Sequence, residues 1–540
     1  MVSGAMAWAA AVVIASAAWG ADGRDCAGVA EAPAGKPFHA GSRSQVFVDR
    51  ALVRSAENII YTLHPAAKRP GAVWLSHVQD EQNPGPCGVK VLFDEEEKVF
   101  KSWGKGPYNT SVDGLRWSPK EARNETWNHL LRISVIKDAL DPDPARRYKI
   151  VAFGPSKPFP AGMKDADVVG ENPDGSKRIF WHEKGYNTLI SADGKTLVHF
   201  SREPICVGPN HPKPPGDMVT AYYDKRLGLY VAFVKMGPKD RSKATKFTAG
   251  RRAFSMVTSK DFVNWSEPRL VFAVDQEDDD GAAARIEEVR PLLLKPTDPK
   301  LLATHIYGVG GPIELECGVI VLLRLFTNHN TGADGPSEVQ MAFSRDLEKW
   351  ERPFRQPFIP RGKVAPKGET SEWDSCWFNN EGPGVAVGDE VWVYYEARNT
   401  PHDHPVGFSA SSFPAAERAA AQKLVGTKYL SGIGIATWKR DRFVSVDAPA
   451  AGGTLTTVPM TFEGGRLEIN ALTLPGGEIV VTLLDPSGKP VARSRPFAGD
   501  ALRHETQWTS PLDLAVLAGK PVSLRFSIKN AKLFAFAFRP

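Results

Sequence analysis

The chain has 540 residues, 42% hydrophobic and 24% charged, so it can bury a large core and is neither disordered nor collagen-like. Its 67 Lys and Arg residues exceed its 62 Asp and Glu residues by five, without a basic stripe, which argues against a nucleic-acid partner. Fourteen Trp, 48 Gly and 43 Pro residues indicate a β-rich chain of short strands joined by turns.

The amino terminus has the pattern of an export signal. Residues 5–18 form an apolar run, and Ala18-Trp19-Gly20 places small residues at the two positions that a signal peptidase reads. The run is shorter than the roughly 18 to 20 residues that span a bilayer, which disfavours the alternative of a membrane anchor. We therefore expect a signal peptide over residues 1–20, an irregular segment over 21–43, a secreted or periplasmic protein and no membrane span.

A Ser-x-Asp-x-x-x-Trp pattern recurs along the chain after short apolar strands. Ser and Asp side chains can close a turn on backbone N–H groups, and the following Trp can fill the gap to a neighbouring sheet. The copies, the last two of them degenerate, are Ser111–Trp117, Ser259–Trp265, Ser344–Trp350, Ser191–Leu197 and Ala436–Phe443.

The spacing of these copies, about 70 to 95 residues, predicts small antiparallel sheets stacked around an axis. We predict an all-β chain with a five-bladed β-propeller over residues 44–445, each blade carrying one such turn. The alternative is a large β-sandwich in which the turns are coincidental. Beyond residue 446, alternating strands such as Arg466–Asn470 and Glu478–Leu484 predict a separate C-terminal β-sandwich over residues 446–540.

Four segments carry a resemblance to a known family, namely Leu63–Lys68, Asp143–Lys149, Ser259–Trp265 and Asp441–Ala448. They resemble the invertase and levanase type glycoside hydrolases of family 32 and their five-bladed relatives in family 43. More closely, the whole chain after the signal resembles the secreted family 32-like proteins of planctomycete-type bacteria. The resemblance implies a five-bladed propeller followed by a sandwich, and a glycosidase that cleaves a plant or algal type glycan.

The sequence also departs from that group. The Trp-x-Asn-Asp-Pro-Asn-Gly nucleophile motif and the Arg-Asp-Pro triplet are absent, and Ile136–Ala139 is only a loose echo of the triplet. Glu316-Cys317 matches the Glu-Cys pair that holds the acid/base, but it lies in the expected fourth blade, whereas the family has it in the third. We therefore do not transfer the family's catalytic residues.

Glycosidic hydrolysis generally needs two carboxyl groups that flank the bond, one protonated and one ionised. In five-bladed relatives these acids lie where the inner strands of successive blades begin. Asp217, Glu288 and Asp374 precede expected inner strands, so we predict that they meet in the axial pocket. Glu288, between Arg285 and Arg290, is assigned as the acid, and Asp217 or Asp374 as the base. The alternative is that each is a solvated loop carboxylate or a strand cap.

Five further residues are candidates for substrate binding. Four carry guanidinium or imidazole groups near strand ends, which can hold sugar hydroxyls or carboxylates, and the fifth is an acid on an amino-terminal strand of the kind that often closes the ring, for which a blade-closing cap is the alternative. They are Asp49, Arg251, Arg290, Arg398 and His404. We expect no metal, because His402-Asp403-His404 lacks a visible third ligand and the acidic run 275–280 fits a solvated loop better than a calcium loop. We expect no cofactor, because no nucleotide-binding motif is present.

Three functions remain open: a glycoside hydrolase, a non-catalytic carbohydrate-binding propeller, and a structural scaffold. A polysaccharide lyase is a variant of the first, and it would need a Tyr or His base beside an Arg that neutralises a uronate. The expected partner is an oligo- or polysaccharide. The sugar, the linkage, the stereochemical outcome and the oligomeric state are not predicted.

Overall fold

The computed structural model describes residues 36–78, 80–104, 107–122, 132–155, 168–171, 177–179, 184–200, 205, 216–238, 241–379, 382–407 and 410–540. The expected signal peptide lies outside these residues. Within them, no helix combines the length and the apolar character needed to cross a membrane.

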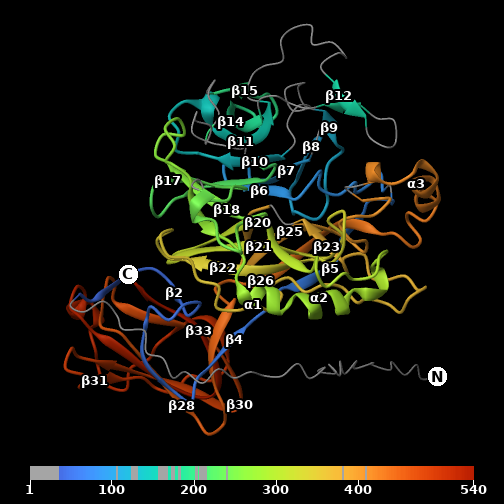
Figure 1. Ribbon diagram of the computed structural model, residues 1–540. Coiled ribbons are helices and arrows are strands. Elements are labelled where there is room, and N and C mark those ends of the chain that lie inside the picture. The colour runs from blue at the N-terminus through green and yellow to red at the C-terminus, as the bar shows by residue number, and fades with distance from the viewer. Residues whose placement is uncertain are drawn as a thin grey trace, which may run out of the picture.

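The described strands are arranged as a five-bladed β-propeller with a second β unit beside it (Figure 1). Blade one contains β6 (Lys90–Asp94), β7 (Val99–Trp103), β8 (Pro107–Ser111) and β9 (Glu121–Ala122). Blade two contains β10 (Arg132–Lys137), β11 (Tyr148–Pro155), β14 (Lys184–Ser191) and β15 (Val198–His199), with the hairpin β12 (Val168–Glu171) and β13 (Lys177–Ile179) between β11 and β14.

Blade three contains β16 (Val219–Asp224), β17 (Leu229–Val234), β18 (Phe254–Ser259) and β19 (Arg269–Phe272). Blade four contains β20 (Ala303–Leu315), β21 (Gly318–Asn328) and β22 (Ser337–Ser344). Blade five contains β23 (Trp377–Asn379), β24 (Gly384–Val387), β25 (Glu390–Arg398), β26 (Ser431–Lys439) and β5 (Ala67–Leu75). A short helix, α3 (Ala415–Gln422), lies between β25 and β26.

The ring closes in blade five, where β5 from the amino-terminal part of the chain is the outermost strand. It pairs antiparallel with β26, with Val73 opposite Gly434 and Ala67 opposite Thr437. After β26 the chain leaves the propeller for the second unit. This exit explains why the fifth copy of the repeat, around Asp441, is degenerate. In blade five the outer strand is β5, so the chain does not turn after β26 into a further strand of the same blade.

The Ser-x-Asp turns lie directly after the third strand of each of the first four blades. In blade three, the Asp261 carboxylate accepts hydrogen bonds from the Val263 and Asn264 N–H groups at 2.9 and 2.7 Å, and from the Ser259 hydroxyl at 3.0 Å. Asp113, Asp193 and Asp346 accept equivalent pairs of N–H bonds. Prediction and structure agree on these four turns.

Each turn also needs a residue with positive φ directly after the Asp. Gly114 and Gly194 supply it at no steric cost, both at 74°. Phe262 and Leu347 adopt 66° at the same position, and both side chains are fully buried between blades. The burial of a large apolar side chain offsets the backbone strain there, which costs on the order of 1–3 kcal/mol.

The second unit is one hydrogen-bonded network of nine strands. Its members are β2 (Gln45–Val46), β3 (Val53–Glu57), β4 (Ile60–Leu63), β27 (Val444–Ala448), β28 (Gly453–Thr457), β30 (Arg466–Leu484), β31 (Pro490–Arg493), β32 (Asp500–Glu505) and β33 (Ser523–Arg539). Beside it, β1 (Phe38–Gly41) pairs with β29 (Met460–Phe462). In Figure 1 the blue strands β2 and β4 lie among the red strands of this unit.

The first strands of the chain therefore pair with its last ones, although the sequence boundary at residue 44 assigned them to the propeller. β3 pairs with β28 and β4 with β27, so the described chain enters the second unit, passes through all five blades and returns. The description of this unit as a β-sandwich stays a prediction.

Two helices lie between blades three and four, where the sequence predicted a solvated loop followed by an inner strand. The acidic run expected as a solvated loop is α1 (Gln276–Asp280), which begins with a reciprocal capping box between Asp275 and Asp278. It is followed by α2 (Ala282–Glu288). The expected inner strand over residues 289–293 is instead a 3₁₀ turn, Arg290–Leu292. That strand assignment was wrong, because the Ala-rich run and its cap favour a helix.

Candidate functional site

The axis of the propeller encloses a cavity of about 310 Å³, lined by the inner strands of all five blades. Its walls come from the middle and the carboxyl ends of β10, β16 and β20 and from most of the length of β6 and β24, and its acidic residues are Glu95 and Glu314. Asp217, Glu288 and Asp374 are not among its lining residues. The cavity therefore lies toward the end of the propeller opposite to the inner-strand starts.

The structure places the three predicted catalytic carboxylates beside three different cations. The Asp217 carboxylate, two residues before β16, contacts Lys235 Nζ at 2.7 Å. Glu288, at the end of α2, forms an ion pair with the buried Arg361 guanidinium. Asp374 is buried, contacts Lys68 Nζ at 2.7 Å and accepts a hydrogen bond from the Tyr395 hydroxyl at 2.8 Å.

Four of the five predicted substrate-binding residues are engaged in structural contacts. Asp49 binds the Arg345 guanidinium through both carboxylate oxygens. Arg251 binds Asp279 in the same way, and the exposed Arg290 binds Glu287. His404 is buried against Tyr429, and this burial, with the nearby Arg398 charge, lowers its pKa to about 4.

The fifth, Arg398, belongs to a group of cations and aromatic rings that the sequence prediction did not assemble. We call it the aromatic–cation cluster; its members are Lys235, Arg252, Tyr307, Arg324, Trp377, Arg398 and His402. They come from the middle of β21, the end of β25, the first half of β20, the start of β23, and the segments that directly follow β17, precede β18 and follow β25. Because these strands are antiparallel, all seven lie at the end of the propeller where the inner strands begin.

Tyr307 is the centre of this cluster. Three cations lie near its ring centroid: Lys235 Nζ at 4.5 Å, the Arg252 guanidinium at 4.8 Å and the Arg324 guanidinium at 5.0 Å. Its hydroxyl group is 2.9 Å from Nε2 of His402. Each cation over a ring face contributes about 0.5–2 kcal/mol, so the ring holds together charges that would otherwise repel one another.

Arg324 links the cluster to the inner strand of blade five. Its fully buried guanidinium donates to the Phe378 carbonyl at 2.9 Å and to the Asn379 side-chain oxygen. Asn379 in turn donates to the Glu396 carboxylate at 3.2 Å. Glu396 is exposed, although the residues on either side of it in β25 are buried. Sequence reasoning missed Glu396, whose signal was a single acid at the end of an apolar strand.

Two accessible carboxylates thus lie at this end of the propeller, Asp217 on blade three and Glu396 on blade five. Burial by surrounding protein raises the pKa of Asp217, but the Lys235 ammonium and the Arg132 guanidinium outweigh it, and the net pKa lies below its ordinary value. Asp217 is therefore ionised at neutral pH. The pKa of Arg398 is lowered to about 10, because the effect of burial is larger than that of the Glu396 charge, which raises it.

The imidazole of His402 is neutral over the whole physiological range. Burial, together with the charges of Arg398, Arg252 and Arg324, lowers its pKa to about 3. Burial also raises the pKa of Tyr307, helped by Asp217 and opposed by three guanidinium groups. At neutral pH the pair is a phenol and a neutral imidazole, so neither group of the pair carries a charge.

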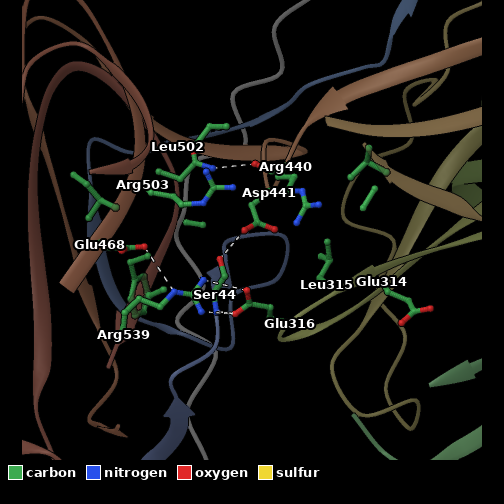
Figure 2. A pocket seen from close by; sticks show the side chains of 17 residues that line it. Ser44, Glu314, Leu315, Glu316, Arg440, Asp441, Glu468, Leu502, Arg503 and Arg539 are labelled. Carbon is green, nitrogen blue, oxygen red and sulfur yellow. Dashed lines mark hydrogen bonds and ion pairs between the residues drawn. The ribbon is translucent and has the colours of Figure 1, made fainter. Parts of the chain in front are cut away.

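A second cavity, of about 170 Å³, lies between the propeller and the second unit. Figure 2 shows its charged residues: the Ser44 hydroxyl group donates to Asp441, and Arg539 binds Glu316. Burial raises the pKa of Asp441. Every labelled acid near the centre of this view has a partner within the protein, so we assign the cavity to the junction rather than to a substrate.

No protein-family model matches the sequence, and no curated protein matches it. Solved structures similar to it include an N-acetylgalactosamine deacetylase from F. plautii, 14% identical over 73% of this chain and 96% of that chain, with a TM-score of 0.35. A family 43 arabinoxylan arabinofuranohydrolase from Bacillus subtilis is 12% identical over 93% and 96% of the two chains, with a TM-score of 0.28. A family 32 β-fructofuranosidase from Bombyx mori is 9% identical over 87% and 95%, with a TM-score of 0.32.

The structural neighbours therefore include glycoside hydrolases of families 43 and 32. At these identities and TM-scores no residue or activity is carried over from them. The narrower, planctomycete-type group stays a prediction.

Proposed function

We propose that the protein is an exported, glycosidase-like enzyme that cleaves glycosidic bonds at the aromatic–cation cluster. The observation that carries the proposal is the placement of Asp217 and Glu396, two accessible carboxylates at the same end of the propeller, on either side of the buried Arg324. Two carboxyl groups in different environments are what acid–base hydrolysis of a glycosidic bond requires. The second unit is proposed as a β-sandwich accessory module.

In this proposal Asp217 is the ionised base and Glu396 the acid. Lys235 holds the Asp217 carboxylate ionised, and Asn379 orients Glu396 by donating to one of its oxygens. Tyr307 and the cations around it would bind the sugar beside the scissile bond. Glu288 and Asp374 then have structural roles, because Glu288 forms an ion pair with Arg361 and Asp374 forms one with Lys68.

A glycan-hydrolysis screen with purified protein tests this assignment. We expect Asp217→Asn and Glu396→Gln each to lower turnover by about 100-fold or more, the usual loss when a general acid or base is removed, without a change in Tm. Glu288→Gln is the matched control, because Glu288 is an equally accessible acid on α2, and it should retain turnover. If Glu288→Gln is inactive and Glu396→Gln is active, the assignment is wrong and the trio predicted from the sequence regains support.

One observation favours a second reaction class, polysaccharide lysis. Tyr307, with Arg252 and Arg324 beside it, has the phenol group and the guanidinium groups that abstraction of a proton next to a uronate would use. A lyase product carries a new carbon–carbon double bond that absorbs ultraviolet light, whereas a hydrolysis product does not. Appearance of that absorbance, lost in Tyr307→Phe but not in Glu396→Gln, would favour the lyase.

A further inference from the structure

Two cations of the aromatic–cation cluster, Lys235 and Arg252, lie near the same aromatic ring, that of Tyr307. The Asp217 carboxylate contacts Lys235 Nζ at 2.7 Å. Buried or half-buried charges in proteins are normally matched by opposite ones, so the place beside Arg252 is suited to an anion.

Arg252 is the clearest case, because its guanidinium is held in place without an acidic partner. It lies 4.8 Å from the Tyr307 ring centroid and 5.6 Å from that of Phe326. In the part of the chain that the structure describes, no carboxylate contacts it. Its neighbour Arg251, by contrast, binds both oxygens of Asp279.

Lys235 lies near the same ring, and its ammonium group is repelled by neighbouring guanidinium groups. Burial lowers the pKa of its ammonium group, and the charges of Arg252 and Arg324 lower it further, while Asp217 raises it. The Asp217 carboxylate therefore attracts the Lys235 ammonium group, whereas the Arg252 and Arg324 guanidinium groups repel it. An anion bound between Lys235 and Arg252 would relieve this repulsion and would gain a bidentate, charge-assisted hydrogen bond from the guanidinium.

We propose that Arg252 and Lys235, over the Tyr307 ring, form a subsite for an anionic group on the glycan, a carboxylate or a sulfate. The inference rests on the proposed function, since it takes the ligand of this face to be a sugar. It deepens that function by naming the substrate class, an acidic rather than a neutral glycan. Carboxylate and sulfate share the chemistry that a guanidinium fork recognises, and the test distinguishes them.

Affinity electrophoresis in gels that contain polysaccharide tests the subsite. The probes are polygalacturonate against its carboxyl-reduced form, and dextran sulfate against dextran. We expect the wild-type protein to be retarded by at least one acidic polymer, to be retarded much less by the neutral counterpart, and to lose retardation as salt is added. Retardation by polygalacturonate only identifies a uronate subsite, and retardation by dextran sulfate only identifies a sulfate subsite.

The variant is Arg252→Gln, which keeps the length of the side chain but removes its charge, and we expect a dissociation constant raised about tenfold or more. Arg290→Gln is the control, since Arg290 is an exposed arginine on the helical insertion that binds Glu287. Equal retardation by acidic and neutral polymers, or equal losses in the two variants, would overturn the subsite. Either result leaves the proposed function standing if Asp217→Asn and Glu396→Gln still abolish hydrolysis of a neutral glycan.

Discussion

Arg324 shows how single residues organise this end of the propeller. It is the one charged side chain in the strand Gly318–Asn328, which is otherwise largely apolar, and it is fully buried. Its partner across the sheet is Gly308, where a Cβ atom would lie 2.9 Å from the guanidinium. The missing side chain of Gly308 leaves room for the guanidinium to reach Phe378 and Asn379 on the next blade. A lone arginine in an apolar strand was the sequence signal for this site.

Removal of the Lys235 charge should change the pH dependence of the reaction. The ammonium group holds the pKa of Asp217 below its ordinary value, so in Lys235→Met that pKa rises. The base is then protonated at a higher pH, and the acidic limb of the kcat/KM profile should move upward. Measurement of kcat/KM from acidic to neutral pH checks this. Lys225→Met, which changes the other end of β16, should leave the limb in place; an unmoved limb in both variants would argue against Asp217 as the base.

Among the elements, the Ser-x-Asp turns carry a stabilising contribution that depends on pH. The N–H groups of Asn264 and Val263 and the Asn264 side chain hold the pKa of Asp261 below its ordinary value. A carboxyl with a depressed pKa in the folded state stabilises the protein above its unfolded pKa of roughly 3.9, and this contribution is lost as the pH falls toward the folded pKa.

Asp261→Ala should therefore lower the free energy of unfolding by about 1 kcal/mol at neutral pH, the typical cost of losing a side-chain cap. The difference from wild type should shrink below about pH 4, because the Asp261 carboxyl of the unfolded chain takes up a proton there before that of the folded protein does. Urea unfolding at both pH values measures it. Lys260→Ala alters an exposed residue in the same turn and should have little effect at either pH. A penalty that stayed constant with pH would mean that the carboxylate charge is not what stabilises the turn.

The same turns explain how much of the fold could be predicted from the sequence. Their bonds connect residues only two or three positions apart, so the pattern alone identified four of the blades. The sequence analysis predicts a solvated loop over residues 275–280 and a strand after Glu288. The capping box of Asp275 and Asp278 is the local evidence for a helix in this segment. The cluster around Tyr307 joins residues up to 167 positions apart, Lys235 and His402, and no local sequence pattern indicates contacts between residues so far apart.

At the scale of the whole molecule, the propeller and the second unit share a hydrophobic cluster. Val46 of β2, Val48 just after β2, and Ala535 of β33 pack in the same cluster as Phe343 of blade four and Val393 of blade five. A chain cut near residue 446 would also leave β3 and β4 without the strands with which they pair. The two units are therefore expected to unfold together, in one transition.

Two of the ion pairs that cross this junction should differ sharply in their contribution to stability. Arg345, in the turn of blade four, binds both oxygens of Asp49 at 2.7 and 2.8 Å, and also the Gln45 side chain and the Val46 carbonyl, each at 2.9 Å. Arg503 of the second unit binds Asp389 of blade five at 2.7 Å, but both side chains are more than half exposed. Solvent screens the second pair, whereas Asp49 is only 6% exposed.

Arg345→Met should lower the free energy of unfolding by about 3–5 kcal/mol, because it leaves the Asp49 carboxylate buried and uncompensated. The double variant Asp49→Leu with Arg345→Met should recover part of that loss, since no unpaired charge remains at the junction. Arg503→Gln is the matched control across the same junction and should change the urea midpoint little. Urea unfolding followed by both tryptophan fluorescence and far-ultraviolet circular dichroism measures all three variants. Equal shifts for Arg345→Met and Arg503→Gln, or a double variant less stable than Arg345→Met, would show that the buried pair does not join the two units in the way its geometry indicates.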